Sequence, residues 1–300
     1  MPTTENAAPA ACRSAWWVLV ISRFPLAVLY ALARVSAFLS YAVFRHRQHV
    51  VRTNLSLAFP ELDEKGLREV AKRFHWGFAQ IGVEIIKAAT IDREAMKRRV
   101  RAVNIDLPQA EIARGRTVLL MTAHQCNWEW QLHSLALQIG CPYYVAYKPL
   151  KNAWADREMY AMRSRFGAQM LPAPQLMPDL LRNRDVPRAI SMAVDQEPPQ
   201  DERKHWVRFL NRDSAFYMGA DRIVRATGHP VFFVEMRRTA RGYYEIEFRT
   251  LAQADEKLKV GELTERYAAA VEAQIRASPP DWPWSHKRWK RSRGETLRAS

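Results

Sequence analysis

The segment from residue 117 to residue 140 holds two side chains whose types and spacing suit acid–base chemistry. His124 and Glu129 are separated by four residues, in the pattern His-x4-Glu. Histidine titrates near neutral pH, and a carboxylate beside its ring fixes the tautomer and stabilises the imidazolium. Such a pair suits a catalytic dyad, in which the His124 ring takes a proton from an alcohol as a general base and Glu129 orients the ring; a structural histidine in a loop is the alternative.

A buried strand and a helix are expected to position this pair. The apolar run at 117–121 predicts the strand, and Asn127 is well placed as the N-cap of a helix that Gly140 ends. In one continuous helix, a five-residue spacing would separate His124 and Glu129 by about 140° around the axis. A turn between strand and helix instead allows the carboxylate to reach the imidazole. The predicted buried face of the helix comprises Trp128, Leu132, Leu135 and Ile139.

Short apolar runs alternate with helical patterns along most of the chain. This alternation predicts an α/β fold with a mixed, largely parallel sheet flanked by helices. In such sheets, sites form beyond the carboxyl ends of the strands. The loop 196–204 is expected to be mobile. The expected strands are 117–121, 143–147, 189–194, 231–236 and 243–248, and the expected helices are 60–89, starting at Pro60, 128–139, 153–166, 214–227 and 262–277.

The apolar stretch at residues 16–44 is interrupted by charges and a proline. Arg23, Arg34 and Arg45 recur every 11 residues, which keeps them on one stripe of a single helix. The charge-free runs are about ten residues long, short of the roughly 20 that a membrane-spanning helix needs. We therefore predict a retained membrane-associated helix, either lying in the interface or spanning with its arginine face against protein. A buried hairpin and a cleaved signal peptide are less favoured alternatives.

The chain of 300 residues is strongly basic. It carries 46 Lys plus Arg against 31 Asp plus Glu, a formal net charge of +15. This charge favours anionic partners, and a membrane surface and nucleic acid are the two candidates. The sequence has no zinc-finger spacing, no aromatic RNA-binding strand and no helix-turn-helix pattern, so no nucleic-acid partner is predicted. Its three cysteines lack paired spacing, which argues against a disulfide framework.

Two other kinds of chemistry remain open around His124. A zinc ion is one, with His124, Cys126, Glu129 and His133 as ligands, but their spacing matches no familiar zinc site. A covalent intermediate on the Cys126 thiol is the other; it needs a lowered thiol pKa, for which the predicted helix N-terminus near His124 is a source. A small buried cysteine beside the motif is favoured over that nucleophile. We predict that neither a metal nor an organic cofactor is required.

Several segments, taken in order, resemble the bacterial lipid A biosynthesis acyltransferases, the late lauroyl and myristoyl transferases. The resemblance runs from about residue 16 to residue 290, and the family's hallmark is a His-x4-Asp/Glu motif after a strand. One departure is the Phe-Tyr-Met-Gly sequence at 216–219, where family members commonly have Phe-Phe-Gly, and it bears on the choice of acyl chain. The other matching segments are NLSLAFP at 54–60, YKP at 147–149, MRSRFGAQML at 162–171, Asp195-Gln196 and PPDWPWSHKRWK at 279–290.

This resemblance implies a role for each candidate residue. It implies His124 as the general base and Glu129 as its orienting partner. An oxyanion forms when a hydroxyl attacks a thioester carbonyl, and Arg163 or Lys148 is the implied source of stabilising positive charge. Asp195 is expected to position a loop or a substrate hydroxyl. The tryptophans of the C-terminal signature are expected to be structural.

The implied function is that of a membrane-associated O-acyltransferase with a glycerolipid-acyltransferase-like fold. Such an enzyme moves a fatty acyl chain from an acyl carrier protein, or from coenzyme A, to a hydroxyl of a lipid A precursor, which is a phosphorylated glycolipid. The implied location is the cytoplasmic face of the inner membrane of a Gram-negative bacterium. The alternatives are an acyltransferase for another membrane glycolipid or phospholipid, and a non-enzymatic basic protein that binds a membrane surface.

Four regions are expected along the chain. A disordered N-terminus at 1–15 precedes a membrane-anchoring hydrophobic helix at 16–46. The acyltransferase domain is expected at 47–290, followed by a basic C-terminal tail at 291–300.

Overall fold

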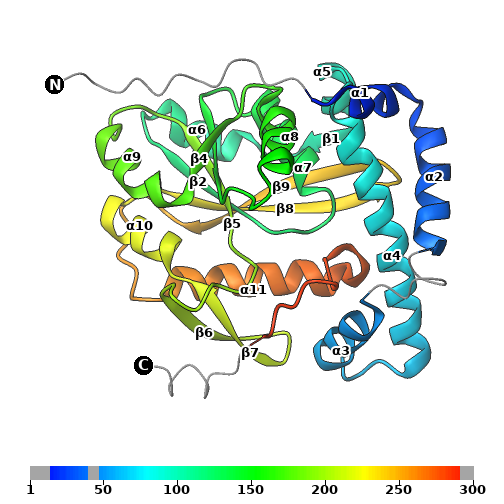
Figure 1. Ribbon diagram of the computed structural model, residues 1–300. Helices are drawn as coiled ribbons and strands as arrows, with labels where there is room; N and C mark the ends of the chain where they lie inside the picture. Colours follow the sequence, from blue (N-terminus) through cyan, green and yellow to red (C-terminus); the bar gives the residue numbers. More distant parts are fainter. Residues whose placement is uncertain (1–13, 40–46, 291–300) are drawn as a thin grey trace.

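A seven-stranded sheet forms the centre of the computed structural model, which describes residues 14–39 and 47–290 (Figure 1). The strand order is β1-β9-β8-β2-β5-β3-β4, and every neighbouring pair is parallel except the β8–β9 hairpin. This is the mixed, largely parallel sheet that the sequence predicts. The strands are β1 Val100–Ala102, β2 Val118–Thr122, β3 Tyr143–Tyr147, β4 Gln169–Pro172, β5 Ala189–Ala193, β8 Val231–Ala240 and β9 Tyr243–Ala252; β6 Lys204–Phe209 and β7 Arg212–Tyr217 form a separate antiparallel ribbon.

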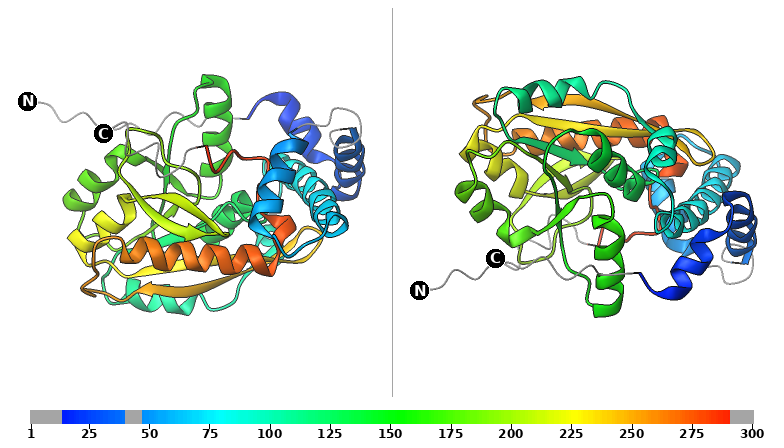
Figure 2. Two further views of the ribbon diagram at one scale, coloured as in Figure 1. Left: turned by 90° about the horizontal axis from the view of Figure 1, so that it is seen from below. Right: turned by 90° about the horizontal axis from the view of Figure 1, so that it is seen from above.

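Helices cover both faces of the sheet, as Figure 2 shows from two further directions. Helix α7 lies on one face, and α11 lies on the other, with the β6–β7 ribbon beyond it (Figure 1). The helices are α1 Trp16–Arg23, α2 Leu26–Phe38, α3 Gln48–Ala58, α4 Glu64–Lys87, α5 Arg93–Arg99, α6 Asp106–Ala113, α7 Trp128–Gln138, α8 Ala153–Ser164, α9 Leu176–Arg182, α10 Gly219–Thr227 and α11 Glu262–Ala277, with 3-10 turns η2 Ala173–Gln175 and η3 Pro279–Asp281.

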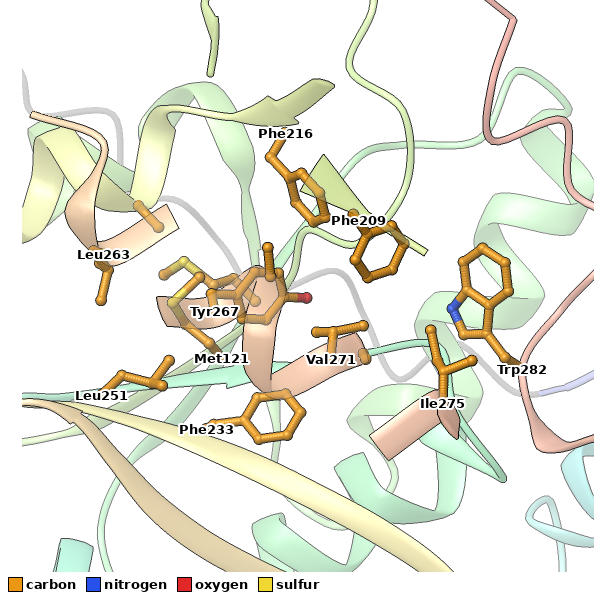
Figure 3. Packing of buried hydrophobic residues seen from close by; sticks show 14 of the residues in the cluster. Met121, Phe209, Phe216, Phe233, Leu251, Leu263, Tyr267, Val271, Ile275 and Trp282 are labelled. Carbon is orange, nitrogen blue, oxygen red and sulfur yellow. The ribbon is translucent and has the colours of Figure 1, made fainter. Parts of the chain in front are cut away.

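Successive residues of the central strand β2 belong to two different hydrophobic clusters. Leu119 and Met121 pack into the cluster that contains Tyr267 of α11, part of which Figure 3 shows. Val118 and Leu120 pack into the other cluster, which contains apolar residues of α7. Because side chains alternate across a strand, a strand that is apolar at every position requires cover on both faces. The strand that leads to His124 is therefore fixed from both sides.

The five expected strands are present, with ends that shift by a few residues. The helix expected at 214–227 is wrong in its first part, because β7 runs to Tyr217 and α10 begins at Gly219. The buried residues Ala215 and Phe216 lie opposite Trp206 and His205 of β6 in the antiparallel ribbon. Cross-strand pairing and burial therefore override the helical pattern at the start of this segment.

The long helix expected at 60–89 begins later than predicted. Helix α4 starts at Glu64, and the side chain of its N-cap residue Asp63 accepts a hydrogen bond from the backbone of Gly66. Pro60 lies in the preceding turn instead of the first helical turn. The N-cap hydrogen bond, which a proline cannot make, fixes the start of the helix at Asp63.

The described part of the apolar N-terminal stretch forms two helices, where the sequence analysis expects one hydrophobic helix at 16–46; the role of this stretch as a membrane anchor stays a prediction. Helices α1 and α2 meet at an angle of 109°, and Pro25 is the N-cap of α2. A proline lacks the N–H that would continue the preceding helix, so the chain bends there. Arg23 and Arg34 therefore lie on different helices, and the guanidinium of Arg34 lies over the ring of Trp76 of α4 at 5.4 Å.

Residues 1–13 and 40–46 lie outside the described residues, as does the tail at 291–300. The predictions for the N-terminus before residue 14, for Arg45 and for the tail therefore stay untested. Within residues 14–39 and 47–290, only the bent α1–α2 pair reaches the length and composition of a membrane span, and no single helix does.

Candidate active site

The turn at residues 123–127 connects β2 to α7 and carries the predicted base. The Asn127 side chain accepts a hydrogen bond from the backbone of Trp130 at 3.0 Å, which confirms Asn127 as the N-cap of α7. The helix ends before Gly140, whose φ of +79° suits a glycine. Cys126 also has a positive φ, of 53°, which is unusual for a residue with a Cβ and makes the turn tight.

Asp195 is the carboxylate that holds the His124 ring. Oδ1 of Asp195 lies 2.6 Å from Nδ1 of His124, and Oδ2 accepts a hydrogen bond from the His124 backbone N–H at 3.1 Å. An ionised carboxylate can only accept hydrogen bonds, so Nδ1 carries the hydrogen and Nε2 keeps a free lone pair in the neutral ring. Among the described residues, Nε2 has no hydrogen-bond partner, and the side chain is 21% exposed.

The electrostatic surroundings favour the charged form of both groups. Burial acts to lower the pKa of His124, but the charge and hydrogen bond of Asp195, together with the charge of Glu129, outweigh it and raise that pKa above the usual value. Burial acts to raise the pKa of Asp195, but the charge and hydrogen bonds of His124 outweigh it and lower that pKa. Asp195 is therefore ionised at neutral pH and stabilises an imidazolium at His124.

Glu129 has a different partner from the one that the sequence predicts. Its carboxylate accepts two hydrogen bonds from Arg163 of α8, at 2.9 Å from Nε and 2.6 Å from Nη2. Burial acts to raise the pKa of Glu129, but the charge and hydrogen bonds of Arg163 outweigh it and lower that pKa. The expected hydrogen bond from His124 to Glu129 is therefore replaced by a bidentate ion pair, because Asp195 is already in contact with Nδ1 of His124.

Trp128 lies between the two carboxylate pairs. Its Nε1 donates a hydrogen bond to Oε1 of Glu129 at 3.1 Å. Its ring contacts the His124 ring edge-on, with centroids 5.3 Å apart. Glu129 therefore influences His124 through its charge and through the position of Trp128.

The other sequence candidates lie as follows. Lys148 is exposed in the loop that follows β3, at the edge of the sheet where His124 and Asp195 follow β2 and β5. Burial raises the pKa of the Cys126 thiol well above its usual range, which contradicts the activated thiol that a covalent intermediate needs. His133 is buried with its ring against Phe166, and burial lowers its pKa to about 4. No group of three or more potential metal ligands occurs in the described part of the chain.

Three residues that the sequence analysis did not assign to the site fix the positions of the strand ends and of Asp195 through hydrogen bonds. The hydroxyl of Tyr267 in α11 donates to the carbonyl oxygen of Thr122 at 2.6 Å and accepts from the backbone of Val194 at 3.3 Å. It thereby joins the ends of β2 and β5, just before His124 and Asp195. Trp282 Nε1 donates to Oδ2 of Asp195 at 3.0 Å, and Arg288 Nε donates to the carbonyl oxygen of the same residue at 2.8 Å. In the sequence, the tryptophan-rich C-terminal pattern is the feature from which a contribution of this segment to the site could have been predicted.

A buried carboxylate on α4 supports the start of α7. Glu84 is fully buried and accepts hydrogen bonds from Asn127 Nδ2 at 2.8 Å and from the hydroxyls of Tyr30 and Tyr244 at 2.7 Å each. The Glu84 carbonyl oxygen also accepts from Trp130 Nε1 at 2.8 Å. Because Asn127 is the N-cap of α7, this network links α2 and β9 to the turn that carries His124.

The His124–Asp195 pair lies at the carboxyl ends of parallel strands, and its geometry is compatible with general-base chemistry at Nε2. The family model described as "Bacterial lipid A biosynthesis acyltransferase" matches residues 11–291. The chain belongs to this family. The acyltransferase therefore uses an acyl donor and a lipid acceptor, and a non-enzymatic binding protein is excluded. A comparison with curated proteins finds no match.

Proposed function

We propose that this acyltransferase transfers a fatty acyl chain from the thioester of an acyl carrier protein to a hydroxyl of a phosphorylated lipid A precursor, with His124 as the general base. The observation that carries the proposal is the His124–Asp195 contact of 2.6 Å, which leaves Nε2 as the free, partly exposed nitrogen. A base in this state needs a substrate hydroxyl, since the described residues place no nucleophilic side chain at Nε2.

The proposed reaction uses that geometry. Nε2 of His124 takes the proton of the acceptor hydroxyl while its oxygen attacks the thioester carbonyl carbon. The new C–O bond gives a tetrahedral oxyanion, and Asp195 stabilises the imidazolium. Collapse of the oxyanion breaks the C–S bond, and the imidazolium returns its proton to the leaving thiolate. The products are an ester on the acceptor and a free thiol on the donor.

Arg163 is our candidate for stabilising the oxyanion. Nε and Nη2 of its guanidinium are bonded to Glu129, which fixes the plane of the group and leaves Nη1 for a substrate oxygen. Lys148 is the second candidate, because it lies exposed at the same edge of the sheet. Loss of an oxyanion donor lowers kcat by about 10² to 10³, whereas loss of a group that binds ground and transition states equally raises KM.

The α1–α2 pair is our candidate for membrane attachment. One side of α2 packs against α4, while Val28, Leu32 and Val35 are exposed at spacings of four and three. Trp16 of α1 and Phe24, between the two helices, are also exposed. An apolar surface of this kind, together with a net charge of +15, suits the anionic cytoplasmic face of the inner membrane of a Gram-negative bacterium. The same charge favours encounter with an acidic carrier protein.

Mass spectrometry of the acceptor lipid tests the proposed reaction. Purified protein is incubated with a phosphorylated lipid A precursor and either acyl carrier protein or coenzyme A bearing the same acyl chain. We expect one additional ester-linked chain on the acceptor, formed faster with the carrier protein. Faster transfer from coenzyme A would overturn the choice of donor, and transfer to a phospholipid in place of the glycolipid would overturn the choice of acceptor.

A further inference from the structure

The carboxylate of Asp195 is fully buried and receives hydrogen bonds from two sides. His124 contributes its ring N–H to Oδ1 and its backbone N–H to Oδ2, and Trp282 contributes its indole N–H to Oδ2 at 3.0 Å. Trp282 is 87 residues away in the sequence and belongs to the C-terminal segment. Building on the proposed role of His124, we infer that Trp282 is a positioning residue that sets the basicity of His124 through Asp195.

The direction in which Trp282 changes the pKa of His124 follows because both residues donate hydrogen bonds to the same negatively charged carboxylate, that of Asp195. When His124 is protonated, the imidazolium draws charge density from the Asp195 carboxylate, and the indole N–H then has a weaker acceptor. The hydrogen bond of Trp282 is therefore strongest when His124 is neutral. A donor that favours the neutral ring lowers the pKa of His124 relative to the same pair without that donor. Trp282 thus moderates the increase in pKa that Asp195 causes.

Packing fixes the direction of the indole N–H. The Trp282 ring contacts Trp284 at 4.8 Å between centroids and Phe209 at 6.4 Å, and it is 1% exposed. Figure 3 shows Trp282 beside Phe209 at the edge of this cluster. Arg288 of the same segment binds the carbonyl oxygens of Asp195 and Ala215 and is also buried. The C-terminal segment therefore holds both the side chain and the backbone of Asp195.

Other charged groups also act on His124, and the proposed test keeps them constant. Glu129 of α7 raises its pKa, Arg163 of α8 lowers it, and His286 of the C-terminal segment interacts with it. Asp195 raises the pKa of His124, and the charge of Arg288 acts on Asp195. A Trp282→Phe substitution removes one hydrogen bond and changes none of these charges. A change in the pKa of His124 in that variant therefore reports the hydrogen bond.

Trp284→Phe is the matched control. Trp284 is equally buried, contacts the same ring cluster, and donates its indole N–H to the carbonyl oxygen of Pro279 at 2.6 Å. The two substitutions remove similar ring volume and one indole hydrogen bond each. They differ in whether the acceptor is the carboxylate paired with His124. A purely structural role for these tryptophans predicts equal effects from both.

The measurement is an NMR titration of the full-length protein with ¹³C-labelled histidine rings, with the His124 signal assigned by its loss in His124→Gln. We expect Trp282→Phe to raise the pKa of His124 by about half a unit, a roughly threefold change in proton affinity. The acid limb of kcat/KM should move up by the same amount, and Trp284→Phe should change neither. A pKa that is unchanged or lowered in Trp282→Phe, or an equal shift in Trp284→Phe, would overturn the inference.

Two further provisions keep the test decisive. If Trp282→Phe does not fold, benzothienylalanine at position 282 retains the ring shape without the N–H, and the same shift is expected. The titration does not depend on turnover. Full activity in His124→Gln together with the expected pKa shift would therefore reject the proposed base while leaving the coupling through Trp282 intact.

Discussion

At the residue scale, the two ring nitrogens of His124 have different surroundings, and this difference decides which nitrogen is open to a substrate. Nδ1 is bonded to Asp195, while Nε2 is free among the described residues. Glu129, five residues along the chain, is bonded to Arg163 instead. Asp195 is therefore the group that stabilises the imidazolium, and Glu129 acts from a distance.

Substitution of each carboxylate by its amide separates these roles. Asp195→Asn removes the charge that stabilises the imidazolium and presents an amide to Nδ1, so we expect kcat/KM to fall by about 10² to 10⁴. Glu129→Gln should lose less, because Asp195 still orients the ring. The measurement is steady-state acyl transfer with both variants. A larger loss in Glu129→Gln than in Asp195→Asn would reassign the orienting group to Glu129.

With His124 as the proposed base, the pH dependence of the reaction follows from the raised pKa of its ring. A general base must be neutral, so kcat/KM should rise with pH through a pKa above the usual value for histidine and fall at lower pH. Any residual activity of Asp195→Asn should have its acid limb at lower pH, because the charge that raises the pKa is gone. A wild-type acid limb below the usual histidine pKa would contradict this assignment.

The sequence predicts His124, Asn127 and Gly140 from local pattern, but it does not show which carboxylate contacts Nδ1. Asp195 lies 71 residues from His124 and reaches it because β2 and β5 pair in parallel, with Thr122 opposite Ala193. That register is a long-range property, whereas the His-x4-Glu spacing is visible locally. Local spacing therefore favoured Glu129.

At the scale of elements, the Glu129–Arg163 ion pair joins α7 to α8. The Glu129 side chain is 5% exposed and that of Arg163 is 24% exposed. Arg163→Met should destabilise the fold by about 3–5 kcal/mol, because it leaves a buried carboxylate without its partner. The double variant with Glu129→Gln should recover much of this loss. Urea unfolding of the wild type, the two single variants and the double variant measures the coupling free energy. Additive losses in the free energy of unfolding would contradict the pairing of Glu129 with Arg163.

The Glu84 network joins α2, α4, β9 and the start of α7. Glu84→Ala leaves three buried donors without an acceptor, and each costs about 1–3 kcal/mol. We therefore expect a loss of at least about 3 kcal/mol in the free energy of unfolding. The exposed Glu61 provides the control, since Glu61→Ala should change stability by less than about 0.5 kcal/mol. Equal effects of the two substitutions would contradict the network.

At the scale of the whole molecule, a basic α/β domain carries a bent helix pair whose outer surface is apolar. The alternation of strands and helices predicts this architecture well, because each strand needs cover on both faces. The short ribbon of β6 and β7 is not predicted, because its stability comes from cross-strand pairing and from burial of Phe216. The bend at Pro25 follows from the missing N–H of proline, but the 11-residue spacing of the arginines favoured one continuous helix in the sequence analysis.

Membrane attachment can be tested without disturbing the packed side of α2. Replacement of Val28, Leu32 and Val35 by serine removes exposed apolar surface and retains Tyr30, which is bonded to Glu84. We expect weaker co-sedimentation with anionic vesicles at an unchanged Tm. Val260→Ser changes an exposed valine elsewhere and should leave vesicle binding unaltered. Unchanged vesicle binding by the triple variant in high salt would contradict attachment through these helices.

The central claim is that His124 is the base for acyl transfer to a hydroxyl, and the rate of transfer by His124→Gln tests it most directly. Glutamine retains an amide donor for Asp195, so the fold is preserved and only the base is lost. Single-turnover transfer of a labelled acyl chain from acyl carrier protein to the phosphorylated glycolipid should slow by about 10² to 10⁴. A rate within about tenfold of the wild-type rate, in a protein with unchanged Tm, would contradict the claim.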